Sequence, residues 1–196
     1  NAVNDLLYSN NDYIPALVEK CRMAINLQDF ELLKEAYTEL LKSDKKSVMG
    51  YIYWTFYLLV NQGNLDEARE KYEKLVGLIN EQEPDNMHLM MLVAKLMSRI
   101  CGRATVILTI SIRIIEKCRQ LDSMAIEPIL ELANNFYMIE NYSQAFNLFK
   151  MAASMNMDSS ELSPMIGILK TQMAKGEMQE AEMQLPFFTE MLEGEK

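Results

Sequence analysis

Few side chains in this sequence could carry out chemistry. The chain contains one histidine, His88, and three widely spaced cysteines, Cys21, Cys101 and Cys118. A single imidazole excludes any catalytic or metal site that needs two histidines within one chain. The cysteine spacing matches no zinc or redox motif, and no GxxxxGK[ST], GxGxxG, HExxH or CxxC motif is present. We therefore expect no metal, no cofactor and no enzymatic activity.

The remaining reactive groups are better explained by structure than by catalysis. Asp66, Glu67 and Glu70 fall in the first turns of an expected helix, where negative charge interacts favourably with the helix dipole. His88 has no neighbouring nucleophile or orienting acid in the sequence, so we interpret it as a surface or groove residue. The three thiols are interpreted as buried and inert in a reducing compartment.

The composition is that of an ordinary folded domain or a short repeat array. Of 196 residues, 49% are apolar and 24% are charged, and glycine and proline are too few for a sandwich or barrel. The net charge of −9 argues against wrapping nucleic acid or an anionic membrane with the whole surface. No apolar stretch approaches the length that spans a bilayer. Because the chain starts with Asn1 and lacks a basic or apolar leader, we interpret it as an internal segment of a longer protein.

An internal repeat organises the elements that would position any functional side chain. A turn residue is followed by a small residue, then an aromatic residue, then an apolar one, as in Gly63, Ala68, Tyr72 and Leu75. The small-residue position recurs with spacings of 35, 39, 38 and 36, at Leu33, Ala68, Ile107, Ala145 and Ala181. This pattern resembles the tetratricopeptide repeat, whose period is about 34 residues.

The repeat predicts an all-α fold, a right-handed α-solenoid of about five tetratricopeptide-like helix pairs. Residues 1–12 are expected to be the end of a preceding helix and residues 13–196 the array. The approximate repeats are 13–44, 48–80, 85–120, 125–157 and 161–196. Apolar residues at helical spacing place the first helix of each pair at 14–26, 48–61, 87–100, 126–139 and 162–175. The small residue lets the two helices of a pair approach, and the aromatic residue packs against the next repeat.

Two segments conflict with this pattern. Residues 108–114 alternate apolar and polar and, taken alone, would predict a β-strand. The repeat phase predicts a helix there, because a lone strand would leave its backbone groups unpaired. Pro186 lies inside the last expected helix and should remove one hydrogen bond and kink or end the helix near Leu185.

The groove of a tetratricopeptide array is lined by its first helices. By repeat phase, the candidate partner-binding positions in this groove are Tyr53, Tyr57, Leu92, Leu96, Asn134, Tyr137 and Lys170. Tyrosine suits peptide contact because it combines a large surface with a polar tip at low entropic cost. The chaperone-binding form of the fold uses a clamp of Lys, Asn and Arg. That clamp is not reproduced here, because the equivalent positions hold Val18, Arg22, Tyr53 and Tyr57.

A second candidate surface is a local excess of positive charge, which we call the basic band. Its six residues are Lys95, Arg99, Arg103, Arg113, Lys117 and Arg119. Residues 95–119 carry a balance of +5, so the rest of the chain carries −14. The band either steers an acidic partner or neighbouring subunit, or is an ordinary solvated helix face. The sixteen methionines are likewise open to two interpretations, core filling or an adaptable binding surface.

A more specific resemblance starts from residues 97–103, Met-Ser-Arg-Ile-Cys-Gly-Arg. This stretch resembles one in the tetratricopeptide repeat protein 21 family. Matching blocks around it are Tyr-Ile-Pro-Ala-Leu-Val (13–18), Leu-Gln-Asp-Phe (27–30), Gly-Asn-Leu-Asp-Glu-Ala (63–68), Glu-Pro-Asp-Asn (83–86) and Gly-Glu-Met-Gln-Glu-Ala (176–181). The resemblance runs from Tyr13 to about Met191, and Pro186 departs from its helical pattern.

The resemblance implies a large repeat subunit of intraflagellar transport complex A. Such a subunit is a non-catalytic scaffold that serves retrograde transport, ciliary import of membrane proteins and cilium assembly. Its implied partners are other complex A subunits and ciliary cargo, with no nucleic acid and no membrane insertion. Its implied location is the cilium or flagellum and the cytoplasm near the basal body. Self-association of the segment is expected only as an artefact of exposed ends. The alternative is a generic tetratricopeptide peptide-binding adaptor or co-chaperone-type module.

Overall fold

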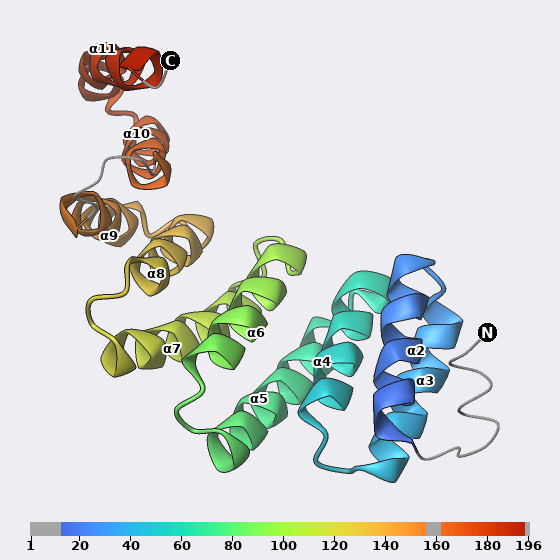
Figure 1. Cartoon of the computed structure of the whole chain (residues 1–196). Helices are drawn as coiled ribbons and strands as arrows, with labels where there is room; N and C mark the ends of the chain where they lie inside the picture. Colours follow the sequence, from blue (N-terminus) through green and yellow to red (C-terminus); the bar gives the residue numbers. More distant parts are fainter. Residues whose placement is uncertain (1–12, 156–161, 195–196) are drawn as a thin grey trace. The chain divides into compact units, whose positions relative to one another are not determined.

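The structure, a computed structural model, describes residues 13–155 and 162–194, without the side chains of residues 187–194 (Figure 1). This part of the chain forms ten α-helices and one π-helical turn, and contains no strand. The elements are α2 (Ile14–Asn26), α3 (Phe30–Ser43), α4 (Val48–Tyr57), η1 (Leu58–Gln62), α5 (Leu65–Gln82), α6 (Met87–Ile100), α7 (Thr105–Leu121), α8 (Ile126–Met138), α9 (Tyr142–Met155), α10 (Ser163–Lys175) and α11 (Met178–Gly194). None of these helices is long and apolar enough to cross a membrane. The helix expected within residues 1–12 lies outside the described residues.

The chain divides into two compact units, residues 1–114 and 115–196, with the division inside α7. In the first unit, α2 packs against α3, α3 against α4, and α4 against α5. In the second unit, α8 packs against α9, α9 against α10, and α10 against α11. Each unit is therefore built from consecutive helix pairs, and the predicted all-α fold of the tetratricopeptide class is confirmed. The approximate limits of the five repeats remain predictions.

Local signals in the sequence set the helix ends. Five helices begin after a polar residue whose side-chain oxygen accepts the backbone N–H three positions on: Asp29, Ser47, Asn64, Asn86 and Asn141. Such a cap stabilises a helix by about 1 kcal/mol. Gly63 and Gly176 end the preceding helices at φ 63° and 80°, a left-handed conformation that glycine adopts without steric penalty.

The repeat position identified in the sequence lies in the core. Its five residues are all buried: Leu33, Ala68, Ile107, Ala145 and Ala181. Four positions after Leu33, Tyr37 packs on α4, and its ring centroid lies 5.9 Å from that of Trp54 and 5.7 Å from that of Tyr57. Phe149 packs as closely on α10, where a Cβ added to Gly167 would lie 2.2 Å from its ring. The predicted packing of the aromatic residue against the next repeat is thus confirmed at both positions.

The two irregular segments have different outcomes. Residues 108–114 lie within α7, as the repeat phase predicts. Of the two effects expected of Pro186, the end of the helix near Leu185 is wrong, because α11 continues through Pro186 to Gly194, and the kink remains a prediction. Proline lacks the N–H that would bond the carbonyl of Glu182, so one helical hydrogen bond is lost, and the neighbouring turns retain helical conformation.

The helix expected at residues 48–61 also differs in detail. Its α-helical part ends at Tyr57, and the chain continues through residues 58–62 as a π-helical turn. The wider turn holds one more residue than an α-helical turn and keeps the backbone bonded. The backbone N–H of Asn64 then bonds the carbonyl of Leu58 at 3.2 Å and closes the segment.

Candidate partner-binding surfaces

Two of the predicted groove residues are part of the core of the first unit. Tyr53 and Tyr57 are only 4% and 3% exposed, and both belong to one buried cluster with residues of α2 and α3. The Tyr53 hydroxyl donates to the carbonyl of Val18 at 3.5 Å, and burial raises the pKa of Tyr53 to about 12. The Tyr57 hydroxyl accepts from the side-chain amide of Gln62 at 3.4 Å. Both tyrosines therefore hold neighbouring helices together and have almost no surface left for a partner.

The predicted groove residues of α6 remain accessible. Leu92 is 48% exposed and Leu96 is half-buried. The methionines of this helix mostly fill the core, since Met90, Met91 and Met97 are buried. The helix therefore offers a surface leucine rather than a methionine face.

The three predicted groove residues of the second unit come together around one lysine. The Lys170 ammonium on α10 donates to the side-chain carbonyl of Asn134 on α8 at 3.1 Å. The same nitrogen lies 4.7 Å from the ring centroid of Tyr137 and 5.3 Å from that of Phe149. Burial lowers the pKa of Lys170. We call these four residues the Lys170 cluster; it places a half-buried cation against two aromatic rings.

The basic band falls on both units. Its residues Lys95, Arg99, Arg103 and Arg113 belong to the first unit, and Lys117 and Arg119 belong to the second. Arg113 forms an ion pair with Glu73 of α5. Both partners are substantially exposed, and such pairs contribute at most about 1 kcal/mol. The role of the band in binding remains a prediction.

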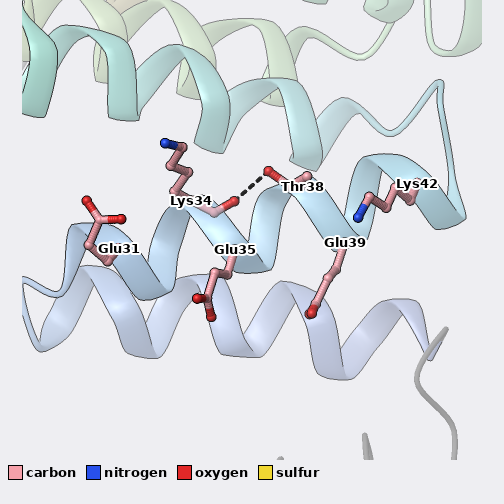
Figure 2. A pocket seen from close by; sticks show the side chains of 6 residues that line it. All are labelled: Glu31, Lys34, Glu35, Thr38, Glu39 and Lys42. Carbon is pink, nitrogen blue, oxygen red and sulfur yellow. Dashed lines mark hydrogen bonds between the residues drawn. The ribbon is translucent and has the colours of Figure 1, made fainter.

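A depression along α3 was not found from the sequence. It has a volume of about 350 Å³ and is lined by Glu31, Lys34, Glu35, Thr38, Glu39 and Lys42 (Figure 2). Figure 2 shows Glu35 and Glu39 on one side of the helix and Lys34 on the other. The Thr38 hydroxyl donates to the carbonyl of Lys34 at 2.6 Å, and Glu39 accepts from Lys20 at 3.0 Å. All six residues are on one helix and exposed, so the depression resembles a solvated helix face more than a ligand pocket. The Glu and Lys residues at helical spacing between 31 and 42 are the sequence signal for such a face.

The nucleophilic side chains are placed as structural residues. None of the three cysteines forms a disulfide. Burial raises the pKa of Cys21 to about 12 and the pKa of Cys101 and Cys118 to about 11, so the unreactive thiol form dominates at neutral pH. Within residues 13–155 and 162–194, no three His, Cys, Asp or Glu side chains are grouped as metal ligands would be. His88 is exposed at the start of α6.

Comparison with known proteins identifies the family. The family model described as the tetratricopeptide repeat protein 21 second ARM domain matches residues 71–194. The chain belongs to the tetratricopeptide repeat protein 21 family. The resemblance noted around residues 97–103 is thereby confirmed.

Relatives in this family match nearly the whole chain. Human tetratricopeptide repeat protein 21B is 27% identical over 189 residues, and mouse tetratricopeptide repeat protein 21A is 24% identical over 188 residues. Each alignment covers 96% of this chain and 14% of the relative. The chain thus spans about one-seventh of the length of these members of the tetratricopeptide repeat protein 21 family.

Solved structures share the fold at low sequence identity. A putative kinesin light chain of Podospora anserina with nearly identical TPR-like repeats has a TM-score of 0.71 and 13% identity, covering 94% of this chain and 97% of that one. The type IV pilus biogenesis factor PilW has a TM-score of 0.66 and 15% identity, covering 94% and 83%. YrrB, a TPR protein with an unusual peptide-binding site, has a TM-score of 0.63 and 12% identity, covering 97% and 92%. At these identities the likeness establishes the fold alone, in line with membership of the tetratricopeptide repeat protein 21 family.

Proposed function

We propose that this chain is a scaffold segment of a large intraflagellar transport complex A subunit. In this role it serves retrograde ciliary transport, ciliary import of membrane proteins and cilium assembly, without catalysis of its own. Membership of the tetratricopeptide repeat protein 21 family across residues 71–194 is the observation that carries the proposal. The helix-pair fold supports it, because family and fold are those of protein-interaction scaffolds.

The proposed mechanism is rigid presentation of side chains to other subunits or to cargo. Within each unit, an aromatic residue of one pair packs into the next pair, as Tyr37 does on α4 and Phe149 on α10. These contacts fix the spacing of successive first helices. Exposed residues on those helices, such as Leu92, are then held at set distances for a partner. The proposed locations are the cilium or flagellum and the cytoplasm near the basal body.

Affinity purification of the full-length parent from ciliated cells, followed by mass spectrometry, tests this proposal. Near-stoichiometric recovery of complex A subunits is expected. The matched control is a parent in which residues 13–196 are replaced by idealised tetratricopeptide repeats of the same length. Loss of particular subunits from the control would assign contacts to this segment. Recovery of only chaperones or scattered cargo with the native parent would overturn the proposal.

A second candidate is a free peptide-binding adaptor or co-chaperone-type module. The observation in its favour is the Lys170 cluster, which unites three predicted groove positions in the second unit. This candidate predicts saturable binding of short extended peptides while complex A subunits stay absent from the parent. Substitution of Tyr53 or Tyr57 is unsuited to testing it, because both residues support the core.

A further inference from the structure

Two adjacent helices of the second unit carry only positive charge. The charged residues of α9 and α10 are Lys150, Lys170 and Lys175, and neither helix contains Asp or Glu. Lys150 and Lys175 approach the same ring, lying 5.5 and 5.2 Å from the centroid of Phe146. The chain as a whole has a net charge of −9. A local cationic surface on an acidic chain can select an acidic partner.

Lys170 stands apart from the other two lysines in the contacts that it makes. Its described partners are the Asn134 amide oxygen and the rings of Tyr137 and Phe149, all of them neutral. Among the described residues, no ion pair includes Lys170. By contrast, Lys175 lies 2.5 Å from the carboxylate of Glu177. A half-buried ammonium with three N–H donors and a single acceptor retains capacity for an anion.

The residues around this ammonium add donors rather than acceptors. The Asn134 side chain uses its oxygen for Lys170, which leaves its NH₂ group as a donor. Tyr137 places its ring on the same ammonium and adds a phenolic O–H. Burial lowers the pKa of Lys170, and a bound carboxylate would oppose that effect by favouring the charged form.

Exposed apolar residues flank Lys170 on its own helix. Ile166 is 52% exposed and Met173 is 49% exposed. They lie four residues before and three residues after Lys170, which places all three on one face of α10. This face therefore alternates apolar, cationic and apolar side chains along the helix.

We propose that Lys170, with Asn134 and Tyr137, binds a carboxylate of a partner peptide that is acidic at one position and apolar on either side. The ammonium supplies the charge, the amide and phenol groups direct the carboxylate, and Ile166 and Met173 contact its apolar neighbours. This inference rests on the proposed scaffold function and names the partner chemistry of one surface.

Peptide binding to the 196-residue chain by fluorescence anisotropy tests the site. Two short peptides with blocked ends carry leucines around a central Glu or Gln, and a third has a free C-terminal carboxylate as its only acid. The Glu peptide is expected to bind about tenfold or more tightly than the Gln peptide, the usual effect of a charge-assisted hydrogen bond. Tighter binding of the third peptide than of the Glu peptide would show that a chain terminus is the source of the carboxylate. Equal affinity for the Glu and Gln peptides would overturn the proposal.

Two variants connect this discrimination to the cluster. Lys170→Met should abolish the preference for Glu over Gln, whereas the matched control Lys175→Met, on the same helix, should keep it. Asn134→Asp places the chain's own carboxylate beside Lys170. This variant should raise the melting temperature and also abolish the preference, and those opposite effects separate a binding role from a structural one. Persistence of the preference in Asn134→Asp would overturn the proposal even where Lys170→Met fails to fold.

The two experiments on the native protein separate this proposal from the scaffold proposal. Failure to recover complex A subunits with the native full-length parent contradicts the scaffold role, whatever the peptide result. Full recovery with the native parent, combined with equal binding of the Glu and Gln peptides, contradicts only the carboxylate site.

Discussion

The hydroxyl groups of Tyr72 and Ser111 lie 3.0 Å apart in a hydrogen bond, although 39 residues separate them in the sequence. Both side chains are fully buried in the first unit. They occupy the same position in consecutive repeats, four residues after Ala68 and four after Ile107. Serine stands where three other repeats have an aromatic residue, and its small side chain leaves room for the tyrosine hydroxyl. A side-chain hydrogen bond thus joins α5 to α7, whereas the packing of an aromatic ring joins α3 to α4 and α9 to α10.

Removing both partners of this bond should destabilise the first unit by less than the sum of the two separate removals. Tyr72→Phe or Ser111→Ala alone leaves a buried hydroxyl unpaired, at a cost of about 1–3 kcal/mol in the free energy of unfolding. The double variant should cost less than the sum of the two single variants. Urea unfolding of the four proteins measures this coupling. Thr109→Ala, which removes an exposed hydroxyl from α7, is the control and should change little. Strict additivity would contradict the prediction.

Two glycine substitutions should have opposite effects. Gly167→Ala places a methyl group 2.2 Å from the Phe149 ring, so the resulting overpacking should destabilise the chain by about 1–3 kcal/mol. Gly77→Ala, inside α5, meets no atom within 4 Å and should stabilise the chain by about 0.5–1 kcal/mol. Thermal and denaturant unfolding report both changes. Phe149→Leu should restore part of the stability lost in Gly167→Ala, and its failure to do so would locate the strain elsewhere.

The free energy of unfolding of the chain should decrease as the pH rises through the alkaline range. Burial raises the pKa of Cys21 from 9.0 to about 12 in the folded protein. Between these values the unfolded chain releases a proton that the folded chain retains. The contribution of the Cys21 thiol to the free energy of unfolding is therefore full below pH 9.0 and is lost as the pH rises towards about 12. Unfolding curves across this range should show a shallower decline in Cys21→Ala. An identical decline would assign the effect to other groups, such as Tyr53.

Charge reversal in the basic band should weaken assembly without unfolding the protein. Arg103→Glu combined with Arg113→Glu reverses two exposed charges and also removes the ion pair with Glu73. The ion pair is exposed, so the stability loss should stay near 1 kcal/mol or below. Co-purification of complex A subunits with the full-length parent is expected to decrease, with unchanged helicity by circular dichroism. Arg69→Glu, an exposed reversal outside the band, is the control. Unchanged co-purification would contradict a binding role and would indicate that the basic band is an ordinary solvated helix face.

Much of the fold follows from local patterns in the sequence. The helices at residues 14–26 and 87–100 have the predicted limits, because apolar spacing and a proline or asparagine at the start are signals within one helix. The buried positions Leu33 and Ala68 follow from the repeat in the same way. By contrast, the π-helical turn at residues 58–62 depends on a change of hydrogen-bond partner that leaves no compositional signature.

The candidate sites were only partly predictable, for a geometric reason. Repeat phase assigns a residue to a helix face but not to a depth, so it placed buried Tyr53 and accessible Leu92 in the same groove. Repeat phase also placed Asn134, Tyr137 and Lys170 in one groove, and in the structure these three side chains lie together. It could not supply Phe149, a second-helix residue whose ring the lysine approaches only after the helices pack.

The π-helical turn at residues 58–62 has a consequence for how this protein family changes over evolution. One fewer residue there would convert the wide turn to an ordinary α-helical turn that continues α4. The turn ends at the left-handed Gly63, and the next helix starts afresh at its own cap, Asn64. A length difference in this helix can therefore be absorbed before Ala68 enters the core, so insertions and deletions among relatives should accumulate at this turn.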